Sequence, residues 1–441
     1  TALLPPLDGL KLATVVFFAI AVTAFYALLR SWRVRWAWLP TAVLVVSNPF
    51  LFRANLAKAQ ALALALLFAS LAALTRRRAA ALIPLAAGYV WLYGGWPLLP
   101  ALATLYLICT LAVRFSPRWF PVHQRFPVLP AVAVTAAAYA GASFGLVVNP
   151  YFPQNLRFYW DQIVQIALIN YQEVIGVGGE WYPYDPLSLL AATSLATLLF
   201  AIALMIYALT VRRQPLAATF LLASTIILYI LTLRSRRNVE YFVPFSLLFS
   251  GLALDRGLRG LPVGAFWREL KQLFTERKIY LVSAVIPILL FPFIVGRDVL
   301  AVWDAFAGSL RFDQFRNASA WLAQHSPPGA LVFHSDWDEF PQLFYHNSAN
   351  TYVVGLDPTF MYRFQPARYW EWERVTTGRE RVRLYEVVAV RFAARYVFVA
   401  TDHEVMLKLV SADAGFREVY RDEDAVIFEV LPPRVSRGPA V

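Results

Sequence analysis

Long apolar runs that end in arginines are the feature that most constrains the fold of this 441-residue chain. Hydrophobic residues make up 59% of the sequence and charged residues only 15%, with a mean hydropathy of +0.53. A soluble globular chain is about 45–50% apolar and about 25% charged. The composition therefore excludes an ordinary soluble enzyme, a disordered protein and a folded nucleic-acid binder, and it predicts an integral membrane protein. The single cysteine, Cys109, excludes a disulfide framework.

Ten segments of residues 1–296 are apolar enough to be considered as membrane spans. A span needs about 20 apolar residues, and fewer where neighbouring helices bury it. We expect a polytopic α-helical membrane domain over 1–296, with spans at 10–29, 36–52, 56–74, 80–93, 96–114, 127–147, 189–211, 215–233, 241–254 and 279–296.

Basic residues follow every odd-numbered expected span and are rarer after the even ones. Those after odd spans are Arg30, Arg33, Arg35, Arg76, Arg77, Arg78, Arg114, Arg118, Arg125, Arg212, Arg213, Arg256, Arg259, Arg268, Lys271, Arg277 and Lys278. The other side holds Lys11, Arg53, Lys58, Arg157, Arg234, Arg236 and Arg237. Because cytoplasmic loops collect Lys and Arg, we expect a multi-pass protein of the cytoplasmic (inner) membrane with Thr1 and residues 297–441 outside.

Residues 297–441 differ from the rest in charge and periodicity. They hold 16 Lys/Arg and 19 Asp/Glu, a net charge of −3, whereas residues 1–296 hold 24 and 9, a net of +15. Short apolar strands alternate with amphipathic helices here, which predicts an extracytoplasmic α/β domain. We expect helices at 313–325, 338–347, 379–392 and 403–411, strands at 330–333, 351–354 and 396–400, and a hairpin of 416–420 and 425–430. Neither GxGxxG nor GxxxxGK[ST] occurs in the sequence, so nothing indicates a nucleotide site.

Three arginines on the expected outer side cannot be explained by topology. Arg234, Arg236 and Arg237, with Tyr241, form a candidate site for a lipid phosphate, because guanidinium groups bind phosphate in a bidentate manner. The alternative is binding to anionic head groups or internal pairing with Glu240.

The long outer loop 148–188 combines aromatic and acidic residues. Aromatic rings stack on sugar faces, so Tyr159, Trp160, Trp181 and Tyr184 are candidates for binding a sugar or an acceptor. The alternative is an aromatic belt at the membrane interface. Asp161, Glu180 and Asp185 are the acids of this loop that could assist catalysis.

Acidic and histidine residues cluster in the C-terminal part. The cluster is His334, Asp336, Asp338, Glu339, His346 and Asp357, of which the first five are candidate ligands of a divalent cation. Their spacing matches no known metal motif, and the competing interpretation is that Asp336 or Asp338 caps the helix that starts there. We therefore predict no metal site, and GxSxG is absent as well.

The layout of many spans, a long outer loop, outer arginines before a late span and an outer C-terminal domain resembles the GT-C membrane glycosyltransferases. This group includes protein O-mannosyltransferases and aminoarabinose transferases. The segment Arg236-Arg237-Asn238-Val239-Glu240-Tyr241-Phe242-Val243-Pro244 is similar to the Arg/Tyr/Pro segment that opens a late span in that group. The stretches Asp336–Tyr345 and Gly355–Pro358 look like the tail of bacterial members.

The resemblance implies transfer of a sugar from a polyprenyl-phosphate donor to an acceptor at the outer face. In such a reaction a carboxylate assists the acceptor hydroxyl and cations stabilise the leaving phosphate. The family's catalytic aspartate lies in a first outer loop, and we expect that loop and the first span to be missing from a chain that begins at Thr1. Asp8, Asp161, Glu180 and Asp185 are weak candidates for the base.

Three readings follow from that expectation. The chain is a fragment of an enzyme, half of a split enzyme whose partner subunit brings the aspartate, or a non-catalytic scaffold subunit that binds partners through its outer domain. Under each of them we expect the chain alone to be inactive. The expected partners are membrane lipids, a polyprenyl-phosphate sugar and that protein subunit, with no nucleic acid.

Overall fold

The computed structural model describes residues 6–115, 127–259, 278–309 and 311–432, with the backbone alone at 278–289, and is mostly helical, at 71%. The chain divides into two units. We call residues 1–168 and 179–308 the helical unit, and residues 169–178 and 309–441 the C-terminal unit.

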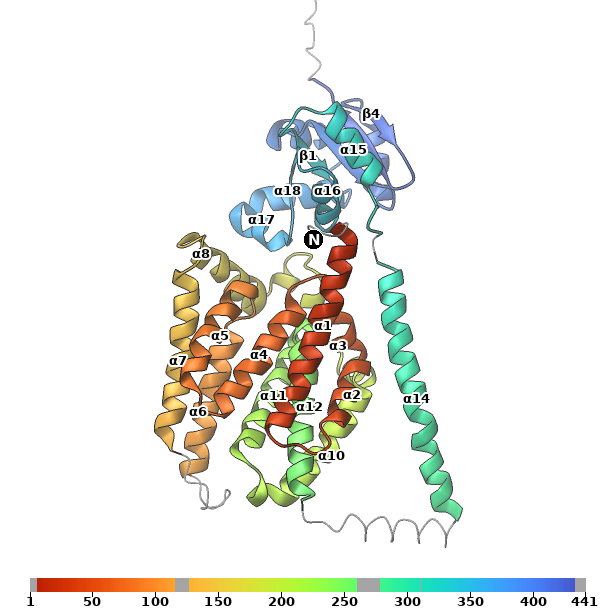
Figure 1. Cartoon of the computed structure of the whole chain (residues 1–441). Helices are drawn as coiled ribbons and strands as arrows, with labels where there is room; N and C mark the ends of the chain where they lie inside the picture. The colour runs from red at the N-terminus through yellow and green to blue at the C-terminus, as the bar shows by residue number, and fades with distance from the viewer. Residues whose placement is uncertain (1–5, 116–126, 260–277, 310, 433–441) are drawn as a thin grey trace, which may run out of the picture. The chain divides into compact units, whose positions relative to one another are not determined.

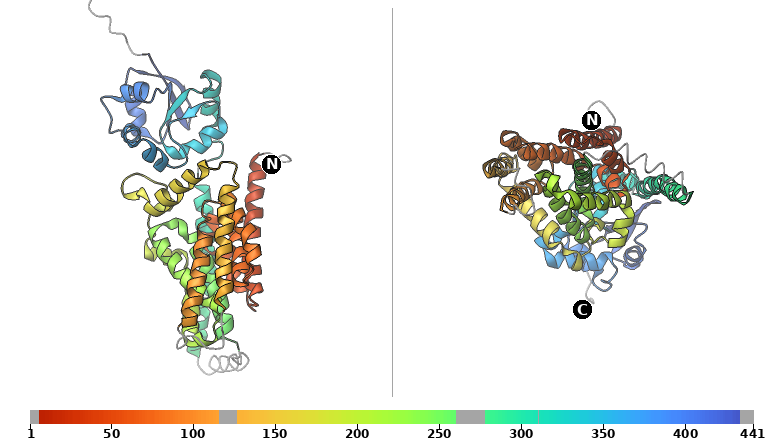
Figure 2. Two further views of the ribbon diagram at one scale, coloured as in Figure 1. Left: turned by 90° about the vertical axis from the view of Figure 1, so that its left-hand side faces the viewer. Right: turned by 90° about the horizontal axis from the view of Figure 1, so that it is seen from below.

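The helical unit consists of helices that lie side by side along one direction (Figures 1 and 2). They are α1 (Pro6–Ser31), α2 (Trp38–Val46), α3 (Asn48–Ala54), α4 (Gln60–Thr75), α5 (Ala79–Leu92), α6 (Leu98–Phe115), α7 (Val128–Val147), α8 (Gln154–Trp160), α9 (Pro186–Ala192), α10 (Ser194–Thr210), α11 (Leu216–Arg234), α12 (Val239–Gly257) and α14 (Lys278–Ala307). A π-helical segment, η1 (Asp161–Ile169), continues α8, and a short 3-10 turn, η5 (Arg236–Asn238), precedes α12.

The apolar helices indicate a membrane protein, as the composition predicts. Among the described residues, five segments are long and apolar enough to cross a membrane: Leu7–Ser31, Leu98–Phe115, Val128–Val147, Ser194–Arg213 and Leu216–Arg234. The helices α4 and α5 are apolar but shorter. A helix overlaps each of the ten expected spans, and the number that cross the membrane stays a prediction.

The second expected span, 36–52, is two helices rather than one. The helix α2 ends before Ser47, whose backbone is extended, and α3 starts afresh with Pro49 in its first turn. Proline has no N–H to donate to the preceding turn and is favoured in the first turn of a helix, so Pro49 fits the start of a new helix at this break.

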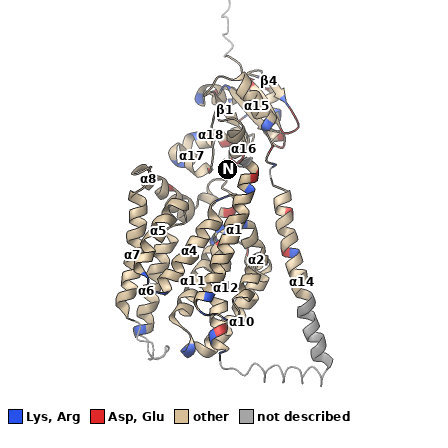
Figure 3. Cartoon of the chain, in the orientation of Figure 1, with Lys and Arg blue, Asp and Glu red and all other residues tan. Residues whose placement is uncertain are grey.

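The C-terminal ends of α1, α4 and α12 meet at one end of the helical unit, which we call the arginine-rich end. Arg76 donates to the carbonyl of Ser31 (3.1 Å), and Arg256 donates to the carbonyl of Trp32 (2.9 Å). Gln214, which follows α10, donates to the carbonyl of Ala253 (3.2 Å). Figure 3 colours Lys and Arg blue, and blue positions lie at this lower end of the helices. Five of the basic residues expected on the cytoplasmic side lie outside the described residues: Arg118, Arg125, Arg268, Lys271 and Arg277.

The helix α12 forms the centre of the helical unit. All of its residues except Leu254 and Arg256 are buried. Its two acids face different ends: Asp255 pairs with Arg35 (2.8 Å) at the arginine-rich end, and Glu240 opens the helix at the opposite end. A buried carboxylate needs such a partner, because an unpaired one would cost several kcal/mol.

The helices α5 and α7 pack closely and run parallel. Gly141 lies against Ile83, and Gly145 lies against Ala87 and Val90. A Cβ built at Gly141 would lie 2.3 Å from the carbonyl oxygen of Ile83. Only glycine permits this approach, as in other small-residue contacts between membrane helices.

The C-terminal unit is a five-stranded mixed sheet with helices. Its elements are α15 (Arg316–His325), β1 (Leu331–His334), α16 (Phe340–His346), β2 (Thr351–Tyr352), α17 (Pro358–Phe364), α18 (Pro366–Thr376), a π-helical segment η7 (Glu386–Arg391), β3 (Tyr396–Ala400), α19 (Glu404–Ala412), β4 (Phe416–Arg421) and β5 (Ala425–Val430). The strand order is β2-β1-β3-β5-β4; β1 pairs in parallel with β2 and β3, whereas β5 pairs antiparallel with β3 and β4.

The predicted strands and hairpin of this unit are present, but two helices were missed. The helices α17 and α18 each start with a proline and fall where no element was expected. The helix expected over 379–392 is shorter and begins near Leu384. Residues 169–178, taken with the outer loop in the sequence, belong to this unit because Ile175 is buried in its core.

Candidate functional site

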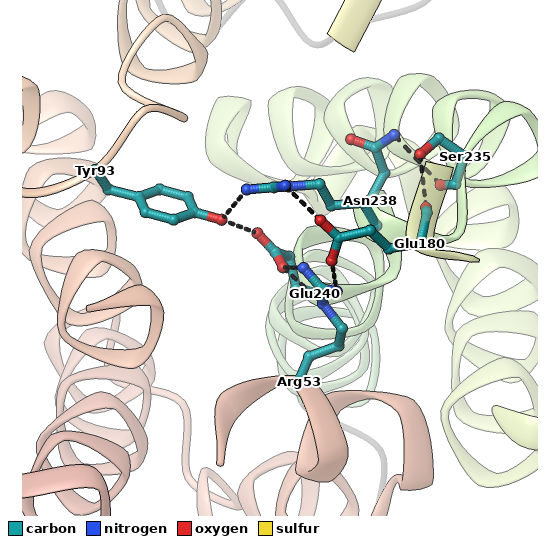
Figure 4. Close-up of polar contacts among 7 residues, drawn as sticks. Arg53, Tyr93, Glu180, Ser235, Asn238 and Glu240 are labelled. Carbon is teal, nitrogen blue, oxygen red and sulfur yellow. Dashed lines mark hydrogen bonds and ion pairs between the residues drawn. The ribbon is translucent and has the colours of Figure 1, made fainter. Parts of the chain in front are cut away.

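Polar side chains gather at the end of the helical unit opposite the arginine-rich end. Arg53, Tyr93, Glu180 and Glu240, which are labelled in Figure 4, form with Arg237 the group that we call the polar cluster. Arg53 lies at the end of α3, Tyr93 follows α5, and Arg237 and Glu240 lie on either side of the junction between η5 and α12. Glu180 comes from the loop before α9. The helix ends therefore bring distant parts of the sequence to one place.

The polar cluster is a closed ring of hydrogen bonds and ion pairs. Arg53 donates from Nε (3.0 Å) and Nη2 (2.9 Å) to one oxygen of Glu240, and from Nη1 to Glu180. Arg237 donates to the other oxygen of Glu180 (2.7 Å) and to the hydroxyl of Tyr93 (2.9 Å). Tyr93 donates to the remaining oxygen of Glu240 (3.2 Å) and closes the ring. Every carboxylate oxygen has a donor, so the ring rigidifies this end of the unit.

The ring has a deep side and an accessible side. The side chains of Glu240 and Arg53 are 1% and 8% exposed, whereas those of Glu180 and Arg237 are 24% and 26% exposed. Lys58, in the loop after α3, is exposed, and its charge acts on Glu180. A ligand would therefore meet Arg237 and Lys58 before it met Arg53.

The charges of the ring hold Glu180 in its ionised form. Burial by itself raises the pKa of Glu180, but Arg237 and Arg53 outweigh burial and lower that pKa to about 2. Burial also opposes the charge of Arg237, yet Tyr93 and Glu180 raise the pKa of that guanidinium above its ordinary value. With Lys58 included, three cations face two carboxylates, so the site is net positive.

Each of the three outer arginines of the sequence contacts the stretch of chain between α8 and α9. Arg234 donates to the carbonyl of Leu168 (2.7 Å), and Arg236 donates to the carbonyl of Pro183 (3.0 Å). Only Arg237 belongs to the polar cluster, and its guanidinium also lies over the ring of Trp181, 4.8 Å from the centroid. Glu240 pairs with Arg53 rather than with any of the three.

The other predicted binding residues are spread around the polar cluster. Tyr241 is buried against Gly95 beneath it. Tyr159 donates to the carbonyl of Val90 (2.8 Å), and Tyr184 lies under Arg236 (5.7 Å). Trp160 is 58% exposed. Of the four aromatic candidates for binding a sugar, Trp160 therefore presents the most open ring.

The predicted acids have different environments. Asp185 is exposed and caps α9 by accepting from the N–H of Ser188 (2.7 Å). Glu180 is held in the ring, and Asp8 is exposed in the first turn of α1. The backbone N–H of Asp161, at the start of η1, donates to the carbonyls of Arg157 and Phe158, but its carboxylate has no hydrogen-bond or ion-pair partner among the described residues. Its neighbour Gln162 packs against Gly94.

Three of the acids singled out in the C-terminal unit act in helix caps. Asp336 and Glu339 form a capping box at the turn before α16, which confirms the capping interpretation for Asp336. Asp357 caps α17 through the N–H of Thr359 (2.8 Å). His346 contacts the carbonyl of Phe312 (3.0 Å). Among the described residues, no group of three His, Cys, Asp or Glu side chains could hold a metal ion.

Sequence reasoning missed the roles of Arg53, Lys58 and Tyr93. Arg53 and Lys58 were visible as charges on the sparsely basic side, which is a usable signal. The partners of Arg53 are Glu180 and Glu240, which lie 127 and 187 positions further along the sequence. Only the packing of the helices brings these residues together.

No protein-family model matches this chain, and no curated protein matches its sequence. The fold and the apolar helices define a helical membrane protein with a small C-terminal sheet domain.

Proposed function

We propose that this chain is a GT-C-like membrane protein that holds the phosphate of a polyprenyl-phosphate sugar at the polar cluster. The observation that carries the proposal is the surplus of positive charge at this end, where Arg53, Arg237 and Lys58 face only two carboxylates. Guanidinium groups form bidentate, charge-assisted hydrogen bonds with phosphate, and an ammonium adds a point charge.

The accessible side of the ring offers a route for the phosphate. Arg237 and Glu180 are each about one quarter exposed, and Lys58 is exposed. A phosphate that approaches from this side would compete with Glu180 for Arg237, while Glu180 would keep its pair with Arg53. The same cations would stabilise the charge that develops on the leaving polyprenyl phosphate during sugar transfer.

The acid that would assist the acceptor is Asp161. Glu180 is a weak base because its pKa is held at about 2, and the carboxylate of Asp185 is used in capping α9. The carboxylate of Asp161 has no partner among the described residues, and the exposed ring of Trp160 is adjacent to it in the chain. A carboxylate that takes the proton of an acceptor hydroxyl contributes about 10²–10⁴ in rate.

This function implies an orientation in the membrane. The arginine-rich end would face the cytoplasm, since cytoplasmic ends collect Lys and Arg. The polar cluster and the C-terminal unit would then lie on the outer side of the cytoplasmic membrane, with ten membrane-inserted segments.

The test is binding of a polyprenyl phosphate, compared with the neutral polyprenol of the same length, to the full chain in nanodiscs. The phosphate should bind more tightly, and Arg237→Gln should weaken its binding by about 10–100-fold, since a hydrogen bond to a charged group contributes about 1.5–3 kcal/mol. Lys58→Gln, which alters an exposed side chain, should weaken it by a smaller factor. The control is Arg78→Gln, which removes an exposed arginine at the other end. Equal binding of both lipids, or equal effects of Arg237→Gln and Arg78→Gln, would refute the proposal.

A second candidate function is that of a non-catalytic scaffold subunit that binds a protein partner through its C-terminal unit. The observation that favours it is the completeness of the ring, in which every oxygen of both carboxylates already accepts a hydrogen bond. Incubation with a polyprenyl-phosphate sugar and acceptors distinguishes the two. Release of polyprenyl phosphate that disappears in Asp161→Asn supports the enzyme, and lipid-phosphate binding without release supports the scaffold.

A further inference from the structure

A large cleft in the C-terminal unit is separate from the polar cluster. Its volume is about 770 Å³, within the range of sites for small ligands. Parts of residues 174–176, 335–337, 369–379 and 402–406 line it, so four stretches of the chain form its wall.

Aromatic rings form one part of the wall. Trp337 and Trp370 are half-buried, while Tyr369 and Trp372 are buried behind them. Tyr369 packs edge-on against Trp370, with ring centroids 5.1 Å apart. This contact holds the ring of Trp370 in place. Fixed aromatic rings with partly exposed surface attract cations, because the ring face carries negative charge density.

Carboxylates form the other part of the wall and exceed the cations. Asp336, Glu373, Asp402 and Glu404 line the cleft, against Arg379 and His403. Arg379 is already paired with Glu373, and Glu404 is paired with Lys408 (2.9 Å).

Two carboxylates of the wall form no ion pair with a Lys or Arg among the residues that the structure describes. The cation nearest to Asp336 is His403, at 4.0 Å, which is charged only when it is protonated. Asp402 has no hydrogen-bond or ion-pair partner among the described residues. A concave surface with an excess of one charge concentrates ligands of the opposite charge.

We propose that this cleft binds an organic cation, a small ligand that carries an ammonium or guanidinium group. The group lies against the indole rings of Trp337 and Trp370 and is neutralised by Asp336 and Asp402. An amino sugar and the basic side chain of a peptide both supply this chemistry. The inference does not depend on the function proposed for the polar cluster, which lies in the helical unit.

Calorimetric titration of the full chain in nanodiscs at neutral pH tests the proposal with two matched pairs of ligands. One pair is glucosamine and N-acetylglucosamine, and the other is Nα-acetyl-lysine amide and its Nε-acetylated form. In each pair acetylation removes the charge and keeps the rest of the molecule. We expect the charged member of at least one pair to bind about tenfold or more tightly than its neutral partner. The pair that shows this preference identifies the source of the cation.

Variants locate the binding. Asp402→Asn alters an exposed carboxylate that has no partner among the described residues, so it should leave the fold intact. It should weaken the binding of the charged ligand about fivefold to tenfold. Trp370→Leu should weaken it as well. The control is Glu423→Gln in the β4–β5 hairpin, where the side chain is 81% exposed and does not line the cleft. The proposal is overturned if no probe binds, if the acetylated ligands bind as tightly as the charged ones, or if Asp402→Asn has no more effect than Glu423→Gln.

Discussion

Replacement of Glu180 by glutamine removes one charge from the polar cluster and keeps the shape of the side chain. In the folded chain the pKa of Glu180 is about 2, against an ordinary value of 4.5. A difference of about 2.5 in pKa corresponds to about 3 kcal/mol, at about 1.4 kcal/mol per pKa unit. Because the Glu180 side chain is only 24% exposed, solvent screening reduces this value little. Glu180→Gln should therefore lower the free energy of unfolding by about 3 kcal/mol at neutral pH.

The dependence on pH gives a sharper test than the loss itself. The folded pKa lies below the unfolded one, so the stabilisation by Glu180 is present above pH 4.5 and disappears as the pH falls from 4.5 to about 2. Below that range the folded and unfolded chains both carry a protonated Glu180. The difference in stability between wild type and Glu180→Gln should therefore shrink steadily through this window, while other carboxylates affect both proteins alike.

The assay is denaturant unfolding of the detergent-solubilised full chain at a series of pH values. The matched control is Glu173→Gln, which makes the same chemical change at an exposed position nearby in the sequence. The control should follow the wild type at every pH. The reasoning is refuted if Glu180→Gln costs less than about 1 kcal/mol at neutral pH, or if its difference from wild type does not change between pH 4.5 and 2.

Two further predictions concern packing and capping. Gly141→Ala should lower the stability by about 1–3 kcal/mol, because its Cβ would meet the carbonyl oxygen of Ile83 at 2.3 Å. In contrast, Gly88→Ala should raise the stability by up to about 1 kcal/mol, because its Cβ would lie at an ordinary distance of 3.6 Å from Leu66. If both variants shifted the unfolding midpoint in the same direction, this account would be wrong. Asp357→Ala should lower the stability of α17 by about 1 kcal/mol, because it removes the acceptor for the N–H of Thr359. The loss should appear as faster amide hydrogen exchange over α17. Unchanged exchange there would show that the cap is not stabilising.

Much of the secondary structure follows from local patterns in the sequence. Apolar runs of sufficient length form helices wherever they were expected, because a helix satisfies its own backbone hydrogen bonds and needs no distant partner. The strand at Tyr396–Ala400 and the hairpin that follows were also predictable from alternation and from the polar turn between β4 and β5. The acidic residue before a short helix predicted the cap at Asp336.

The helices missed by sequence reasoning have a physical explanation. The helices α17 and α18 are 7 and 11 residues long, and both begin with proline. Proline in a sequence indicates a break as readily as the first turn of a helix. Helices this short depend on the core they pack against, where Tyr369 and Trp372 are buried, and not on their own propensity.

The sequence by itself determined that the chain is apolar and helical, and it indicated which helix ends carry the arginines. Only the tertiary structure decided which charges neutralise one another. Glu240 was expected to pair, if at all, with the arginines beside it, but its partner is Arg53, 187 positions away. A local pattern records which residues share a helix face, whereas the neighbours of a helix end are set by how whole helices pack. For that reason the ring at the polar cluster became visible only in the folded chain.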